Sequence, residues 1–385
     1  MRVVCWTQHL TGVGHFVRMR AIAESLGNAH EAYLIDGGRS VPMPGTSKRF
    51  ISIPLNPIFR EDGRLCAEGG AEISCVLAAR SRRLSTVIAD IAPDVLLIEH
   101  YPFSKWELEP EIAAAVESAR ARNRHVRIIA SLRDISPQTK QEDMSPEEYR
   151  VRVIDTLNRC FDGLLVHADP NYARLEESFG DLAEVSVPIA YTGLVVADTP
   201  DRADATMGNH VVISCGGWGA DPAFTNTCIE AFRALQDNEP QWADVLLHVF
   251  PGLALSDAAH TALLHATGEA RNINVARFSS GFAALLQTAK LSVSRAGYNT
   301  CAQILNARVR AVLVPDRRMS DQPRRAALME ANGWATVTCD DPPSKDALID
   351  AMGQAFGRPP PVPSVRLDGA TCTRALLEGG FGMRR

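Results

Sequence analysis

Short apolar runs alternate with amphipathic helical patterns along most of the chain, and this alternation restricts the possible folds more than any other feature. In the helical patterns, apolar residues recur on one face, as Phe16, Met19, Ala23 and Leu26 do. Such alternation predicts βαβ units, in which helices cover both faces of parallel sheets. The apolar runs lie at residues 3–6, 32–35, 94–98, 126–130 and 163–166, and then at 211–214, 245–249, 291–294 and 311–315.

One interruption of this pattern, at residues 193–209, indicates two domains. The segment is polar, contains a proline and has little periodicity, as a linker does. A chain of 385 residues is also long for one core, since single cores stop growing at about 250–300 residues. We predict an α/β protein with two Rossmann-like domains, 1–192 and 210–357, whose parallel sheets face each other across a cleft. A proline-rich segment and a short helix, 358–385, could return to the first domain.

Charge and cysteine content argue against several classes of protein. The net charge of −5 disfavours a nucleic-acid-binding protein, which normally presents a basic face. The nine cysteines include no CxxC pair, so a zinc ribbon or redox motif is not expected. Their scattered spacing, and an N-terminus that turns polar too early for a signal peptide, favour a cytoplasmic location. No apolar run approaches the ~18 residues that span a membrane.

A glycine-rich turn, TGVGH at residues 11–15, follows the first apolar run. Gly12 and Gly14 would let the backbone approach a ligand, and the helix that follows would favour an anion. The turn is not a dinucleotide fingerprint, because Val17 stands at the third glycine position. Glycines alone would indicate only a tight turn. His15, however, would lie at the ligand-binding edge of the sheet, with a pKa suited to a general base.

Two charged pairs end later strands of the same domain and offer a partner for this histidine. Glu99 and His100 end one run, and Arg133 and Asp134 end the next. Either carboxylate, Glu99 or Asp134, could orient His15 and select its tautomer. The alternative for each is a helix cap or a surface ion pair.

The second domain opens with another glycine-rich turn, SCGGWGADP at residues 214–222. The amides near Gly216 and Gly217, together with Trp218, could line a phosphate or a sugar. Asp221 and Pro222 would begin the next helix. An ordinary turn in which the tryptophan only packs is an equally open interpretation.

A third turn, at residues 294–300, has the composition of a diphosphate site. It combines Arg295 with the helix-opening Gly297 and the hydroxyl of Thr300. Helix amides and an arginine can neutralise phosphates without a metal ion. Further on, Asp321 and Gln322 begin a helix after a strand that ends at a proline. Their side chains could hold adjacent sugar hydroxyls, although Asp321 taken by itself indicates only an N-cap.

These motifs together resemble those of GT-B glycosyltransferases, most closely the MurG-like, family 28 type, and a set of uncharacterised predicted glycosyltransferases. The family opens with a glycine-rich turn ending in Gly-His, and its donor half carries an Arg-x-Gly-x-x-Thr stretch that holds the nucleotide diphosphate. A Gln-containing pair that holds the donor sugar follows, and a backbone stretch here represented by Phe278 meets the nucleobase. The matching positions are Gly12, Gly14, His15, Arg295, Gly297, Thr300, Asp321 and Gln322.

The chain departs from the family pattern eight residues after the arginine. The family often has a glutamate there that bonds the ribose hydroxyls, whereas this sequence has Gln303, which can still form hydrogen bonds. The stretch from Gly12 to Arg18 also resembles nucleotide-sugar hydrolases of the same fold, in which the histidine activates water. The long insertion at residues 40–79 favours transfer, because acceptor-binding loops occur in such insertions.

The resemblance implies an inverting, metal-independent glycosyltransferase without a cofactor, a hexosyl- or N-acetylhexosaminyl-transferase with a UDP-linked donor. His15, or a carboxylate near it, would take the proton of a hydroxyl acceptor, which could be a small molecule, a glycan or a lipid-linked compound. A lipid-linked acceptor leaves room for peripheral membrane contact. The alternatives are the hydrolase and a non-catalytic sugar-nucleotide-binding subunit of a transferase complex.

Overall fold

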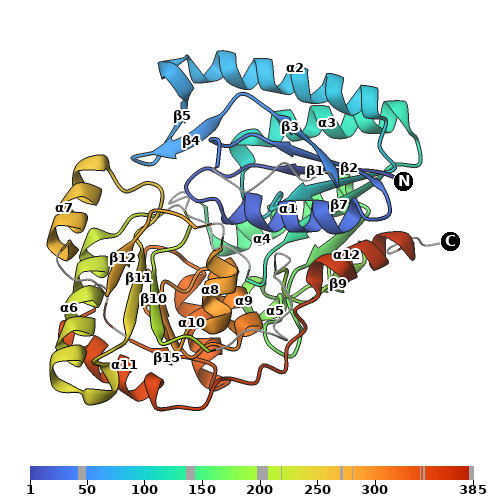
Figure 1. The fold of residues 1–385 in the computed structure, drawn as a ribbon. Coiled ribbons are helices and arrows are strands. Elements are labelled where there is room, and N and C mark those ends of the chain that lie inside the picture. The colour runs from blue at the N-terminus through green and yellow to red at the C-terminus, as the bar shows by residue number, and fades with distance from the viewer. Residues whose placement is uncertain are drawn as a thin grey trace. The chain divides into compact units, whose positions relative to one another are not determined.

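The computed structural model describes residues 1–41, 49–135, 144–196, 207–217, 219–268, 272–279, 281–338, 340 and 343–380. The chain divides into two compact units (Figure 1). Unit 1 comprises Met1–Ala197 and Val365–Arg385, and unit 2 comprises Asp198–Ser364. Of the expected linker, residues 197–206 lie outside the described residues, whereas the amide of Leu194 bonds to the carbonyl of Arg366 within unit 1.

Unit 1 is built on a seven-stranded sheet with the order β3-β2-β1-β6-β7-β8-β9. Every pairing in this order is parallel. The central strand β6 is buried along its whole length, as its sequence VLLIE requires. The strands are β1 (Arg2–Thr7), β2 (Glu31–Asp36), β3 (Phe50–Pro54), β6 (Val95–Glu99), β7 (Arg127–Leu132), β8 (Gly163–Val166) and β9 (Ile189–Tyr191).

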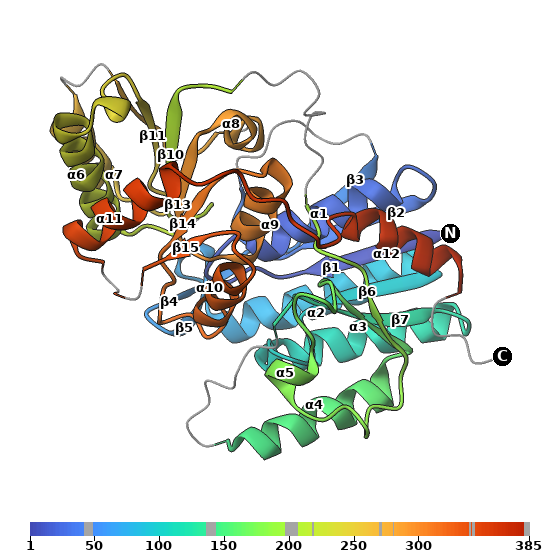
Figure 2. The ribbon, with the colours of Figure 1, turned by 90° about the horizontal axis from the view of Figure 1, so that it is seen from below.

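Helices cover both faces of this sheet, with α2 and α3 on one face and α1 and α12 on the other (Figure 1). Figure 2 also shows α12 beside α1, and the two helices share a core with the sheet that includes Met19, Ile22 and Leu377. The C-terminal helix therefore belongs to unit 1. The helices are α1 (Gly14–Leu26), α2 (Ile73–Ile91), α3 (Glu109–Arg122), α4 (Pro146–Cys160), α5 (Glu176–Phe179) and α12 (Gly369–Glu378).

The insertion at residues 40–79 contains more strand than we expected from its sequence. Its described residues form the edge strand β3, the antiparallel hairpin of β4 (Ile58–Glu61) and β5 (Arg64–Ala67), and the start of α2. Ile58 and Phe59 are buried, so the hairpin is packed against unit 1 through them.

Unit 2 repeats the arrangement with a six-stranded parallel sheet, in the order β12-β11-β10-β13-β14-β15. The strands are β10 (His210–Ser214), β11 (Leu246–Phe250), β12 (Ile273–Val275), β13 (Leu291–Ser294), β14 (Ala311–Leu313) and β15 (Thr336–Val337). The helices are α6 (Pro222–Asn238), α7 (Asp257–Thr267), α8 (Phe282–Thr288), α9 (Tyr298–Ala307), α10 (Gln322–Ala331) and α11 (Lys345–Phe356).

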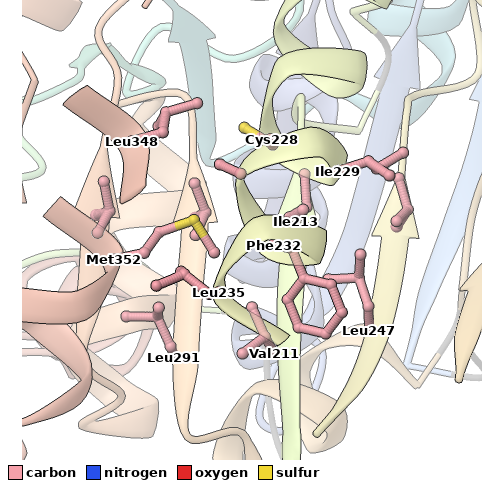
Figure 3. Close-up of a cluster of buried hydrophobic side chains, with 14 of the residues drawn as sticks. Val211, Ile213, Cys228, Ile229, Phe232, Leu235, Leu247, Leu291, Leu348 and Met352 are labelled. Carbon is pink, nitrogen blue, oxygen red and sulfur yellow. The ribbon is translucent and has the colours of Figure 1, made fainter. Parts of the chain in front are cut away.

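The core of unit 2 forms where α6 and α11 pack side by side on the sheet (Figure 3). Phe232 and Leu235 of α6 and Met352 of α11 bury their side chains against Val211 and Leu291 of the strands beneath. The two parallel sheets with covering helices confirm the α/β, two-sheet fold that the alternating sequence pattern predicted. No helix within the described residues is both long and apolar enough to cross a membrane.

A buried arginine fixes the loops that leave the first two strands of unit 1. Arg80 of α2 forms a bidentate ion pair with Glu111 of α3, at 2.9 and 3.0 Å. It also donates to Oε1 of Gln8, at 2.8 Å, and to the carbonyl of Gly37, at 3.0 Å. A side chain at Gly37 would collide with this arginine, since a Cβ there would lie 2.4 Å from its Nη2. These contacts connect α2 and α3 to the loops that follow β1 and β2, and the first of these loops leads into the glycine-rich turn.

We expect Arg80→Ala to destabilise unit 1 by about 3–5 kcal/mol, because it leaves the buried carboxylate of Glu111 without its counter-charge. The matched control is Arg152→Ala, which breaks the ion pair with Glu109 and removes the guanidinium from the Trp106 ring, 4.1 Å from its centroid. That pair is 40% and 33% exposed, and exposed pairs contribute at most about 1 kcal/mol. Urea denaturation of the three proteins gives the comparison. Equal free energies of unfolding for the two variants would contradict the role of Arg80.

Candidate active site

The histidine of the first glycine-rich turn lies in the first turn of a helix. Helix α1 begins at Gly14, and no side chain caps it at Val13. A Cβ added at Gly12 would meet nothing within 4 Å, so the turn borders open space. The side chain of His15 is 21% exposed, which leaves part of the ring accessible to a ligand.

The carboxylate partner of His15 is Glu99. The Nδ1 atom of His15 lies 2.5 Å from Oε1 of Glu99, which is fully buried as the last residue of β6. Because Nδ1 donates to this carboxylate, Nε2 is left as the proton-accepting nitrogen of the neutral ring. Asp134 follows β7 and is also buried, but it forms no hydrogen bond with His15 among the described contacts. The structure thus joins two of the three residues that we expected to be catalytic.

Two further cations bind the same carboxylate. Arg18, one helical turn after His15, donates to Oε1 of Glu99, and the ammonium of Lys105 donates to Oε2. Arg18 and Lys105 are both buried. Lys105 and His100 adopt the left-handed backbone region, each with φ of 67°. Such conformations are unfavourable for residues other than glycine and are concentrated at functional sites.

A second histidine packs against the first. The rings of His15 and His100 meet edge to face, with centroids 4.8 Å apart. Arg133 donates to Nε2 of His100 at 3.2 Å, so Nδ1 of that ring carries the proton and lies 2.9 Å from the hydroxyl of Ser104. His100 is therefore a neutral ring that packs against His15 and has a hydrogen-bond partner at each nitrogen.

Burial is the main reason that His15 stays neutral. Burial, together with the positive charges of Lys105 and Arg133, lowers the pKa of His15 to about 3 in spite of the opposing Glu99 carboxylate. Burial alone would raise the pKa of Glu99, but the contacts with His15, Lys105 and Arg18 hold it well below its usual range. At neutral pH the cluster is an ionised carboxylate with a neutral imidazole whose Nε2 can accept a proton. The pKa of His15 lies well below the value near neutrality that we expected from the sequence, because burial disfavours the charged ring, and the ring is therefore a weaker base than an ordinary imidazole.

This cluster does not fit a metal ion, although one ligand atom each of His15, Glu99 and His100 lies within 4.8 Å of the others. Both oxygens of Glu99 already accept hydrogen bonds from cationic or imidazole groups. Nε2 of His100 accepts a hydrogen bond from Arg133. A divalent cation would have to displace these donors and bind beside several positive charges.

In unit 2, the arginine of the expected diphosphate site is buried beside an acid. Arg295 follows β13 and donates to Oδ2 of Asp221 and to the carbonyl of Val314. Its guanidinium lies over the ring of Phe224, 4.5 Å from the centroid. Asp221 caps helix α6, because its other oxygen accepts from the amide of Phe224 at 3.0 Å. A phosphate that bound Arg295 would therefore compete with a carboxylate.

The helix after this arginine has the properties of an anion site at its N-terminus. Gly297 is the N-cap of α9 in an extended conformation, without a side-chain cap, and the first turn contains no acidic residue. The positive end of the helix dipole is therefore not offset by a carboxylate in its own first turn. Thr300 and Gln303 lie half-buried on the same helix.

The remaining expected donor residues are placed unequally. Gly216 has φ of 94°, which favours glycine, and a Cβ there would meet nothing within 4 Å. Gly217 is exposed and Phe278 is half-buried after β12, whereas Trp218 lies outside the described residues. Nothing in these positions by itself identifies a base or a sugar.

The acid–amide pair that we expected to hold the sugar has internal partners instead. Asp321 is buried, and its Oδ2 accepts from Arg325 at 2.8 Å. It occupies the N-cap position of α10 but makes no capping bond with its side chain. Oε1 of Gln322 accepts from the amide of Asp316 at 3.0 Å. Both side chains therefore support the loop in this structure.

Sequence reasoning missed the cations at Glu99 and the acid at Arg295. Arg18 had a usable signal, because residues three apart on a helix share a face and it lies three after His15. Lys105 had none, since it lies in an irregular segment with no periodicity. Asp221 was recognised only as a helix cap.

Comparisons with known proteins agree with this architecture. Residues 211–354, which lie within unit 2, match the glycosyltransferase family 28 C-terminal domain. A search of curated proteins finds no match.

Solved structures with low sequence identity share the fold over nearly the whole chain. MurG of Acinetobacter baumannii is 16% identical, with 97% of this chain and 94% of that chain covered and a TM-score of 0.53. The Arabidopsis thaliana protein UGT89C1, in complex with UDP-L-rhamnose, is 14% identical, with coverages of 98% and 93% and a TM-score of 0.60. UDP-GlcNAc 2-epimerase of Methanocaldococcus jannaschii is 9% identical, with coverages of 99% and 100% and a TM-score of 0.59. The family match and the shared fold together confirm the resemblance to MurG-like GT-B glycosyltransferases.

The neutral state of three histidines, two of them fully buried and His15 mostly so, predicts a pH dependence of stability. Burial lowers the pKa values of His15 and His167 to about 3 and that of His100 well below its usual range. The unfolded chain protonates these rings below about pH 6.5, so acidification favours unfolding. We expect the free energy of unfolding to fall between pH 6.5 and 5, by up to about 1.4 kcal/mol per pH unit for each ring.

Urea denaturation at several pH values measures this slope for the wild type and for His15→Gln. Between pH 6.5 and 5, above the range in which carboxylates titrate, the slope of the free energy of unfolding against pH should be smaller in the variant by the contribution of one histidine ring. Identical slopes would show that His15 titrates alike in the folded and unfolded states.

Proposed function

We propose that this GT-B chain, whose second unit carries a family 28 glycosyltransferase domain, transfers a hexosyl or N-acetylhexosaminyl group from a UDP-linked donor to a hydroxyl acceptor. Unit 2 binds the donor and unit 1 activates the acceptor. The eight described cysteines are free thiols, which supports a reducing, cytoplasmic setting.

The observation that carries this proposal is the pair formed by His15 and Glu99. The hydrogen bond from Nδ1 to Glu99 orients the imidazole and leaves Nε2 to take the proton of the acceptor hydroxyl. The acceptor oxygen then forms a bond to the anomeric carbon as the bond to the diphosphate oxygen breaks, and the diphosphate leaves with the electron pair. Neither oxygen of Glu99 is available as a nucleophile, because His15, Arg18 and Lys105 occupy them. Direct displacement by the acceptor, with inversion, fits this arrangement.

Donor binding in unit 2 is supported by the family match and by the N-terminus of α9. Helix amides at Gly297 and the guanidinium of Arg295 would carry the negative charge of the leaving diphosphate. A positive side chain and helix dipole can do this without a metal ion. The complex of the Arabidopsis protein with UDP-L-rhamnose supports a nucleotide-sugar donor on this fold.

We expect Arg295→Ala to weaken UDP binding roughly 10- to 100-fold, since a charge-assisted bond to an anion contributes about 1.5–3 kcal/mol. The matched control is Arg233→Ala, which removes the same charge from helix α6, where Arg233 donates to the carbonyl of Ala266. Arg233 lies 12 residues after the N-cap Asp221, about 18 Å along the helix. Isothermal titration with UDP gives both affinities.

A second variant separates phosphate binding from support of the turn. Asp221→Asn keeps a capping oxygen for α6 but removes the charge that competes for Arg295. It should bind UDP at least as tightly as the wild type. Unchanged UDP affinity in Arg295→Ala would mean that the arginine does not bind the donor. Equal losses of UDP affinity in Arg295→Ala and Asp221→Asn would mean that the arginine only supports the turn.

We expect His15→Gln to lose at least about 100-fold in turnover, because a positioned general base contributes roughly 10²–10⁴-fold. UDP affinity should stay within a few-fold, since the donor is assigned to unit 2. The exposed His125→Gln is the matched control in unit 1 and should keep full activity. Release of UDP from a panel of UDP-sugars, with and without candidate acceptors, measures turnover.

The same assay distinguishes sugar transfer from hydrolysis, epimerisation and binding without turnover. Acceptor-independent release of free sugar would indicate a hydrolase, and conversion of the sugar without release of UDP would indicate an epimerase. Wild-type protein that binds UDP and turns over nothing would be a binding subunit. Near-full activity of His15→Gln would move the search for a base to Asp134.

A further inference from the structure

The residue after Glu99 has a backbone conformation that strand geometry does not explain. Successive side chains of a strand point to opposite faces of the sheet, so an extended His100 would point away from the face on which Glu99 meets His15. Instead, β6 ends at Glu99 and His100 has φ of 67°, in the left-handed region. Its ring packs edge to face on the ring of His15, with centroids 4.8 Å apart. The left-handed turn thus brings this ring back to the proposed base.

Hydrogen bonds hold both the backbone and the ring of His100. Its amide donates to the carbonyl of Ser131, at 2.8 Å, and its carbonyl accepts from the amide of Ser104, at 3.0 Å. Its Nε2 accepts from Arg133 at 3.2 Å, and its Nδ1 lies 2.9 Å from the hydroxyl of Ser104. His100 is only 2% exposed. It is therefore shielded from a ligand, and it reaches the site through its contact with His15.

The ring of His15 needs more than one contact to be oriented. The hydrogen bond from its Nδ1 to Glu99 fixes one atom, but the ring could still pivot about that atom and change the direction of Nε2. The ring of His100, at 83° to that of His15, supports a second part of it. The two contacts together define the plane of the ring. General-base catalysis needs such precision, because a misplacement of about 1 Å can cost about 100-fold in rate.

We propose that His100 is a positioning residue, whose ring holds the plane of the His15 ring so that Nε2 points to the acceptor hydroxyl. Glu99 selects the tautomer of His15, and His100 sets its plane. The two nitrogens of His100 serve to fix its own ring and take no part in proton transfer. The inference deepens the proposed function and rests on it for the catalytic meaning of this orientation.

Two variants separate the ring of His100 from its nitrogens. His100→Asn removes the ring, and asparagine tolerates the left-handed region, so the turn after β6 should persist. His100→Phe keeps an aromatic ring against His15 but removes both nitrogens. At about pH 8, above the range in which histidines titrate, we expect kcat for sugar transfer to fall roughly 10- to 100-fold in His100→Asn. His100→Phe should recover most of this loss, and the KM for the UDP-sugar should be unchanged in both variants.

A second readout needs no substrate. The proton on Nδ1 of His15, in its hydrogen bond to Glu99, gives a downfield NMR signal that weakens by exchange with water when the ring moves. The signal is assigned by its loss in His15→Gln. It should persist in the wild type and in His100→Phe and broaden in His100→Asn. Urea denaturation of each variant shows that the fold is intact.

Wild-type kcat in a folded His100→Asn would overturn the proposal. An equal loss of kcat in the two variants would also overturn it, because the effect would then come from the nitrogens and not from the ring. Identical NMR signals in the wild type and both variants would refute the orienting contact itself. A signal that changes only in His100→Asn, in a protein that transfers no sugar, would refute the proposed function and leave the contact intact.

Discussion

The site in unit 1 depends on one buried carboxylate. Glu99 is fully buried at the end of β6, a position in which an ionised group is stable only if it is well paired. Its partners come from helix α1, through His15 and Arg18, and from the segment after β6, through Lys105. Glu99 thereby holds the first turn of α1, the segment that contains Lys105 and the ring of His15 in place. The orientation assigned to His15 follows from its hydrogen bond to this acid, and its neutral state follows mainly from burial.

Unit 2 also has a buried ion pair at the end of its strands, formed by Arg295 and Asp221, and here the positive group is the one assigned to the ligand. Arg295 is buried and held by Asp221 and by the carbonyl of Val314, so its guanidinium is fixed before a ligand arrives. Asp221 supports the arginine and caps α6, but it also competes with a phosphate for the same group. The α9 dipole at Gly297, which no side chain caps, adds attraction for an anion without that competition.

The fold was largely predictable from the sequence, because buried parallel strands have short apolar sequences and the helices that cover them have amphipathic sequences. The location of His15 was predictable for the same reason, since strand ends in parallel sheets share an edge. The choice between Glu99 and Asp134 was not, because it depends on strand order: β6 pairs with β1, whereas β7 lies one strand further away. Lys105 reaches Glu99 through a left-handed residue in an irregular segment, for which the sequence has no periodic signal. The internal partners of Asp321 and Gln322 likewise depend on a loop conformation that the motif does not specify.

The anomeric configuration of the first product tests the central claim most directly. The account assigns direct attack by an acceptor whose proton passes to His15, with no carboxylate free to form a covalent intermediate. Proton NMR of a reaction started with an α-linked UDP-sugar and its acceptor, recorded before any further reaction, should show a β-linked product on the acceptor. An α-linked product would contradict direct displacement, and free sugar formed at the same rate without acceptor would contradict transfer itself.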